Sequence, residues 1–163
     1  MSKPTKYVVS VVLKKTAAGK EFLVVKRPED DKDLPGHWGF PSVSLAPGEL
    51  PEEGALRVCK EKLGCACQPL RFLGIMFQKR NSYDMFLMDI EAVLEEGGQP
   101  SLVLPQEDSG KTMYIEQKWS VDPMDLMPAA TKGSCCASIF LTDRGLFTQT
   151  QWIESLEGSS TVG

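Results

Sequence analysis

The sequence predicts an α+β fold, an α/β/α sandwich in which helices flank a mixed β-sheet. Two observations predict it. Short valine-rich and aromatic runs of strand length stand on both sides of one amphipathic helix, and the last third of the chain returns to helical patterns. The order is β-β-β-α-β-β-β-α-α. A length of 163 residues suits one domain, which we place at residues 1–156, with residues 157–163 as a disordered tail.

The first strands are expected before residue 28. Residues 6–14 are rich in valine and predict a strand buried on both faces. The turn sequence TAAGK joins them to a second strand at residues 21–27, so the two strands predict a hairpin. Residues 28–37 show no apolar periodicity and predict a polar loop. The following residues mix short apolar pieces with prolines.

The main helix is predicted to begin at Pro51 and to stop at Gly64. Proline is tolerated in a first helical turn, and glycine is a common stop. Helical spacing predicts a buried stripe made of Ala55, Leu56, Cys59 and Leu63. On the helix side, residues four apart predict a ladder of ion pairs made of Glu53, Arg57 and Glu61.

The second half of the chain predicts further strands and then helices. Strands are expected at residues 69–80 and 83–94, joined by a tight turn, and at 112–120, with a short strand near 102–104. A short helix is expected at residues 122–130 with Asp122 as its N-cap. Residues 134–156 predict a helical region broken near Gly145.

Composition limits the class of partner. The net charge is −4 and the pI is near 5.1, which gives no basic field for nucleic acid or an anionic membrane surface. The apolar run at residues 7–13 is too short to span a bilayer. Five cysteines, an odd number, fit reduced thiols in a cytoplasmic protein. The pairs Cys65/Cys67 and Cys135/Cys136 leave two interpretations open, a thiolate metal site or small buried hydrophobic residues.

The stretch GELPEEGALRVCKEKLG, residues 48–64, resembles the signature of the Nudix (MutT-type) hydrolases, G-x5-E-x7-R-E-U-x-E-E-x-G-U. The matching residues around and within it are Lys26–Arg27 at a strand end, Trp38, Pro41, Gly48–Glu49, Arg57, Glu61 and Gly64. The resemblance covers most of the chain. It implies the Nudix fold, a mixed sheet flanked by the Nudix helix and by C-terminal helices.

The resemblance also implies an ancestral chemistry, the cleavage of a diphosphate with Mg2+ or Mn2+ held by helix glutamates. This box is degenerate, because Val58 and Lys62 stand at two of the three ligand positions, and Ser42–Val43 replaces a glycine pair. Glu61 and Glu49 are then the catalytic candidates, with Glu61 as the remaining metal ligand. Gly48, Arg57 and Gly64 are expected to be structural. Three later acids could add a base or a ligand: Glu107, Asp108 and Glu116.

Lys62 suggests another use of the same site. Its ammonium would repel a divalent cation at this position, but it could bind phosphate oxygens in the place of the metal. Two functions therefore remain open. One is a pyrophosphohydrolase with weak or altered hydrolysis that uses Mg2+ or Mn2+. The other is a non-catalytic Nudix module, without a metal, that binds a nucleotide-like ligand or a protein partner.

The expected partner is a nucleotide-like small molecule that carries a diphosphate. A membrane is not expected, and the acidic charge disfavours nucleic acid. A homodimer is what many family members suggest.

Overall fold

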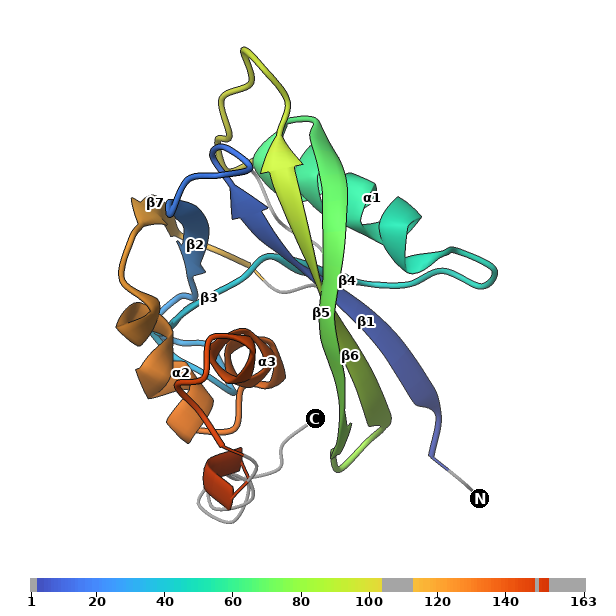
Figure 1. Cartoon of the computed structure of the whole chain (residues 1–163). Coiled ribbons are helices and arrows are strands. Elements are labelled where there is room, and N and C mark those ends of the chain that lie inside the picture. The colour runs from blue at the N-terminus through green and yellow to red at the C-terminus, as the bar shows by residue number, and fades with distance from the viewer. Residues whose placement is uncertain (1–2, 104–112, 149, 153–163) are drawn as a thin grey trace.

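The computed structural model describes residues 3–103, 113–148 and 150–152. Its centre is one mixed β-sheet, flanked by helices on both faces as the sequence predicts (Figure 1). The strands are β1 (Thr5–Lys14), β2 (Phe22–Lys26), β3 (Trp38–Gly39), β4 (Ser42–Ser44), β5 (Cys67–Lys79), β6 (Asp84–Leu94) and β7 (Glu116–Ser120).

Strand β1 organises the sheet. It pairs in parallel with β6 from Thr5 to Lys14, and β5 pairs antiparallel with the far side of β6. On the other side, β1 changes partner along its length: Lys14 pairs with Phe22 of β2, whereas Val8 to Ser10 pair with β4. Strand β2 pairs with β3 and β7. The sheet therefore divides beside the middle of β1. Strands β2, β3 and β7 pair with one another on one side of this division and meet β1 only near its end.

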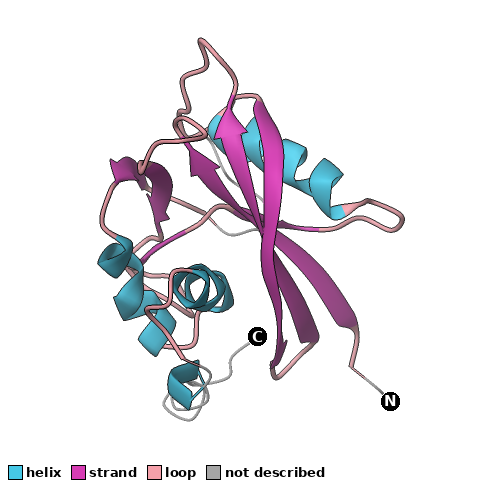
Figure 2. Ribbon diagram, in the orientation of Figure 1, coloured by secondary structure: helices cyan, strands magenta, loops and turns pink. Residues whose placement is uncertain are grey.

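The helices cover opposite faces of the sheet (Figures 1 and 2). Helix α1 (Pro51–Leu63) lies on one face. The other face carries a 3-10 turn η1 (Pro123–Leu126), α2 (Met127–Thr131) and α3 (Cys135–Asp143). No helix in the described part of the chain is long and apolar enough to cross a membrane.

Strand alternation builds two hydrophobic cores. Val9, Val11 and Leu13 of β1 point toward α1, and Val12 points toward α3. Because successive side chains of a strand face opposite sides, a nearly continuous valine run serves both cores. The predicted strand at residues 6–14, buried on both faces, is confirmed in this sense.

The predicted helix at residues 51–64 is confirmed, but its buried stripe differs from the prediction. Leu56 is 46% exposed. The buried face instead includes Val58 and Lys62, which continue the three- and four-residue spacing from Ala55. The predicted ladder also changes, since Arg57 pairs with Glu61 and with Glu49 of the preceding loop.

Smaller differences occur after β6. Residues 101–103 form no strand, and residue 104 of the predicted strand lies outside the described residues. The predicted short helix begins as η1, and Asp122 caps it by accepting a hydrogen bond from Met124 N. Helical structure breaks near Gly145, as predicted, and resumes at residues 150–152. The expected tail, residues 157–163, lies outside the described residues.

The cysteines fall on opposite faces of the sheet. Cys59, Cys65 and Cys67 belong to the core beneath α1, and Cys135 and Cys136 belong to the core beneath α3. All five thiols are free and buried. The sheet separates the two groups, so they are small buried hydrophobic residues and do not form a shared thiolate metal site.

Candidate functional site

A cavity of about 210 Å³ opens where the sheet divides. Its walls come from β1, β4, β6, the loop after β2, the start of α3 and one side of α1. The apolar part of the lining consists of Val8, Leu34, Phe40, Val43, Met85 and Leu87. This volume is below the roughly 300–1,000 Å³ of most ligand pockets, so the cavity suits part of a ligand or a small one.

The cavity lining is basic although the whole chain is acidic. Five cationic side chains line it in the described part of the chain, against the single carboxylate of Asp33: Lys6, Arg27, Arg57, Lys62 and Arg80. These residues come from four different segments, since Arg57 and Lys62 both belong to α1, and only folding brings the segments together. A concave site with an excess of cations focuses a positive potential and attracts anions.

Arg57 fixes the loop before α1 to the helix. Its Nη2 lies 2.9 Å from Glu49 Oε1, its Nη1 lies 3.2 Å from Glu61 Oε2, and Nη2 also donates to Ser44 O at 2.7 Å. The hydrogen bonds from Arg57, together with one from Ala46 N, lower the pKa of Glu49 to about 2. Glu49 and Arg57 thus form a charged clamp between loop and helix.

The two glycines of the box occupy left-handed backbone positions. Gly48 has a φ of 78° in the turn before α1, and Gly64 has a φ of 59° at the helix C-cap. Residues other than glycine are disfavoured in this region, and Gly64 closes the helix by donating to Lys60 O. Both residues therefore occupy backbone positions that favour glycine.

Val58 and Lys62 occupy different environments on α1. Val58 is fully buried in the core beneath the helix. Lys62 is only 5% exposed, lines the cavity, and places Nζ 5.7 Å from the centroid of the Tyr114 ring. Tyr114 in turn accepts a hydrogen bond from Ser42 N at 3.1 Å. Lys62 therefore contributes to the cavity wall, and its ammonium lies near the Tyr114 ring.

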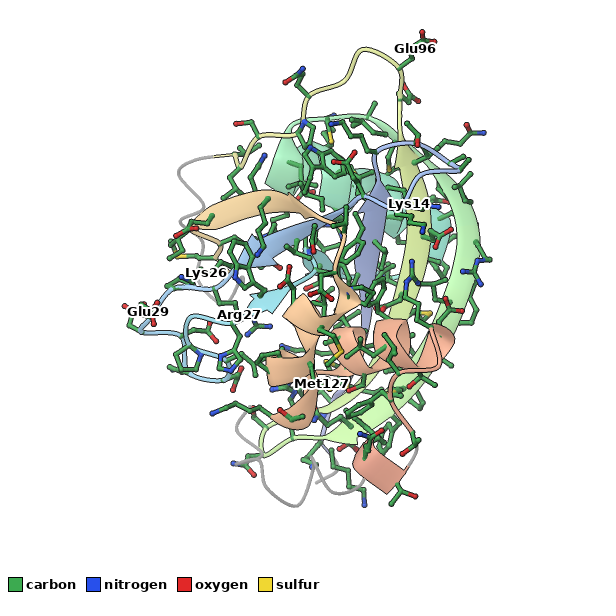
Figure 3. All side chains as sticks on the ribbon, turned by 60° about the vertical axis from the view of Figure 1, so that its left-hand side comes forward. Lys14, Lys26, Arg27, Glu29, Glu96 and Met127 are labelled. Carbon is green, nitrogen blue, oxygen red and sulfur yellow. The ribbon has the colours of Figure 1, made fainter. Side chains whose placement is uncertain are left out.

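Arg27 brings a cation from the end of β2. In Figure 3 it points toward the interior of the molecule, whereas Lys26 and Glu29 lie at the outer side. Its Nη1 lies 3.1 Å from Asp31 Oδ2. Burial acts to lower the pKa of Arg27, but Tyr114 and Asp31 outweigh it, and the pKa is raised. Arg27 stays charged in the cavity wall.

Of the three later acids, the structure describes only Glu116, and it lies apart from the cavity. Glu116 is 57% exposed at its side chain and lies 3.9 Å from Lys26 Nζ, outside the cavity lining. Glu107 and Asp108 lie outside the described residues. Lys6 and Arg80 carry no signal in the sequence pattern, because strand termini often have a lysine or an arginine for solubility alone.

Comparison with known proteins identifies the family. The NUDIX domain family matches residues 4–128, more than half of the chain. The chain belongs to the NUDIX family. No curated protein sequence matches it significantly.

Several solved structures share the fold at low sequence identity. A MutT protein from Methanosarcina mazei Go1 is 18% identical, with a TM-score of 0.63, over 89% of this chain and 96% of that chain. The E. coli ORF135 protein is 14% identical, with a TM-score of 0.58, over 77% and 79%. A MutT NUDIX hydrolase from Burkholderia pseudomallei is 18% identical, with a TM-score of 0.57, over 72% and 83%. At such identities, the likeness shows the fold.

NUDIX proteins generally use divalent metals, so we tested whether the residues of this box fit one. A hard cation needs several oxygen ligands in one place. Here one ligand position is a buried valine, the second is an ammonium, and the third, Glu61, is paired with Arg57. Among the described residues, no three acidic, histidine or cysteine side chains gather as a metal group. The donor set does not fit a divalent cation.

Proposed function

We propose that this NUDIX chain binds a nucleotide-like small molecule through its diphosphate, with Lys62 in the place that a metal takes in other members. The observation that carries the proposal is the position of Lys62. Its side chain is almost fully buried, yet it lines a cavity whose other charges are mostly cationic. Phosphate oxygens are the natural partners of a cation in such a wall.

The surroundings of Lys62 support a phosphate at this end. Arg27 and Arg57 line the same cavity, and each is held by carboxylates of its own, Asp31 for Arg27 and Glu49 with Glu61 for Arg57. These pairs fix the guanidinium planes and reduce the conformational entropy lost when a ligand binds. A pre-organised group of cations suits a compact dianion.

Binding, and not hydrolysis, is the function that this geometry favours. Hydrolysis in the family relies on carboxylates that hold a metal, and Glu61 is engaged with Arg57 at 3.2 Å. Because the described donors do not fit a divalent cation, they offer no metal-bound water to attack a diphosphate. The alternative, weak hydrolysis with Mg2+ or Mn2+, is an outcome that a phosphate-release assay measures directly.

The test is binding without metal. We would measure the affinity of the four ribonucleoside 5′-diphosphates by calorimetry in EDTA, for wild type and for Lys62→Met. Methionine keeps the unbranched apolar stem and removes the charge. We expect wild type to bind at least one of them and the variant to bind it roughly tenfold or more weakly.

The matched control is Lys60→Met, an exposed lysine of the same helix outside the cavity lining. Its affinity should equal that of wild type. Thermal denaturation of each variant checks that it is folded. Equal affinities for wild type and a folded Lys62→Met variant, or binding that appears only when Mg2+ or Mn2+ is added, would overturn the proposal.

A further inference from the structure

Strand β5 is the last strand of the sheet, beyond β6, so its outer edge has no neighbouring strand in the described structure (Figure 1). The inner edge pairs with β6 along the whole strand. On the outer side, the backbone of residues 70–79 makes no hydrogen bond to another element among the described residues. Such free N–H and C=O groups are able to pair with a further strand.

The second half of this edge lacks the features that usually prevent such pairing. Natural edge strands carry charges, prolines or bulges that disfavour contact with another chain. In β5 these features lie at Pro69, at Arg71 and at the bulges before Gly74, and a charge returns only at Lys79. They leave residues 74–78, which pair regularly with β6 and contain neither a charge nor a proline. Five residues are the usual length of a strand.

Three large apolar side chains of β5 are exposed on the face of the sheet that carries α1. Phe72, Ile75 and Phe77 pair in register with alternate residues of β6, and the first of these, Ile90, belongs to the core beneath α1. The spacing of three between Phe72 and Ile75 keeps one face because the bulge inserts an extra residue. On the opposite face, Leu73 and Met76 pack against the core beneath α3.

Aromatic contacts hold Phe77 in place. The centroid of its ring lies 5.0 Å from that of Phe86 on β6, and the ring of Phe86 stacks on Tyr7 of β1 at 5.6 Å. Figure 1 shows the start of β1 and the turn between β5 and β6 at the end of the sheet away from α1. A side chain that is already fixed loses less conformational entropy when a partner covers it.

The exposed apolar area matches what a second copy of the chain needs. The four large apolar side chains Leu70, Phe72, Ile75 and Phe77 are between 42% and 52% exposed. Half of a large side chain is on the order of 100 Å², so the four expose ~400 Å². A standard interface buries ~800 Å² on each partner, and a little over half of that area is apolar.

We propose that the chain forms a two-fold symmetric dimer in which the β5 edges of two copies pair antiparallel and continue the sheet. A two-fold axis brings the same segment of both copies together, so the apolar residues of one edge meet the apolar residues of the other. An uncharged edge with both donors and acceptors is complementary to itself. The dimer is independent of the proposed function, because none of the four residues lines the cavity.

The test is sedimentation velocity over a concentration series of the full chain. We expect wild type to change from monomer to dimer between about 1 and 100 µM, within the affinity range of interfaces of this size. Ile75→Lys and Phe77→Lys should each weaken the dimer about tenfold or more, because an ammonium enters an apolar contact once in each copy.

Hydrogen exchange locates the contact. The backbone amides of residues 74–78 should exchange more slowly at high than at low concentration in wild type, and this difference should vanish in Phe77→Lys. The matched control is Val121→Lys, a position that is 66% exposed in the segment after β7 and away from β5. It should dimerise as wild type does, and thermal denaturation checks that each variant is folded.

Three results contradict the proposal. The first is a wild type that stays monomeric up to about 200 µM, well above the range expected for such an interface. The second is a dimer of unchanged strength in the folded Ile75→Lys and Phe77→Lys variants. The third is a dimer whose concentration-dependent protection lies outside residues 74–78.

Discussion

At the scale of single residues, Glu49 shows how a signature position can serve the fold. Arg57 and the backbone of Ala46 bind its carboxylate and lower its pKa to about 2. In an unfolded chain a glutamate has a pKa of about 4.3. The group therefore stabilises the fold above the unfolded pKa, and this stability is lost as the pH falls through about 4 toward 2.

The corresponding variant is Glu49→Gln. We expect it to lower the free energy of unfolding at pH 7 by about 1–2 kcal/mol, because a partly exposed pair contributes less than its pKa shift implies. Its stability should also depend less on pH between 4.5 and 2 than that of wild type, since the titrating group is gone. Urea denaturation over a pH series measures both. Glu52→Gln, at an exposed position of the first helical turn, should match wild type.

The pKa of Asp89 is shifted in the opposite direction to that of Glu49. It is fully buried on β6, and neither carboxylate oxygen has a hydrogen-bond partner among the described residues. Burial, with the nearby Cys136 and Asp143, raises the pKa of Asp89 well above its usual range. The folded state thus holds a proton that the unfolded chain releases above about pH 4, and its stability falls as the pH rises toward the folded pKa.

We therefore expect Asp89→Asn to stabilise the protein at pH 7 to 8, by about 1–3 kcal/mol, and to have little effect below pH 4. At low pH the aspartate is neutral in both states, so the asparagine removes no cost. The control is Asp30→Asn in the exposed loop. A variant that is equally or less stable than wild type at pH 8 would show that Asp89 is ionised with a partner in solution.

At the scale of elements, α1 combines two functions on one face. Ala55, Val58 and Leu63 pack on the sheet, and Lys62 extends the same face to the cavity. Val58 therefore adds apolar packing at a position where the Nudix signature that the sequence resembles has an acidic residue. We propose that this one difference from the signature both adds packing and removes a metal ligand.

Restoring both glutamates separates these effects. In Val58→Glu together with Lys62→Glu, we expect the free energy of unfolding in EDTA to fall by about 3 kcal/mol or more, because carboxylates replace a buried valine and a buried cation. Mg2+ should recover part of this loss by binding only the folded variant. The midpoint of thermal unfolding, with and without Mg2+, measures the change. Wild type should show no such shift, and a shift of wild type would contradict the assigned donor set.

Most elements were predictable from local patterns, apart from their edges and from the short strand expected near residues 102–104, since residues 102 and 103 form none. The α1 boundaries followed from Pro51 and Gly64, and the strands followed from valine and aromatic runs. The prediction that Leu56 is buried was wrong. The helical spacing is compatible with two different buried faces of α1, and only the position of the sheet decides which of them is buried. The sequence also did not predict that β1 pairs only briefly with β2. The extent of this pairing depends on where β4 becomes the neighbour of β1.

At the scale of the whole molecule, the site is a product of topology. An acidic chain with a net charge of −4 builds a cavity lined mainly by cations. It does so because strand pairing places Lys6, Arg27 and Arg80 around one opening, opposite Lys62 of the helix on the other face. The net charge describes the whole chain, and it does not predict the electrostatic potential inside one cavity.

The sequence by itself determined the family and the layered α+β fold, since these depend on local spacing and on a linear motif. Only the tertiary structure decided that Val58 belongs to the core, that Lys62 is buried in a cavity wall, and that Lys6 and Arg80 meet at Tyr83. The physical reason is the range of the interactions. Helix and strand patterns are set within a few residues, whereas a binding site is set by contacts between segments that the chain itself keeps far apart.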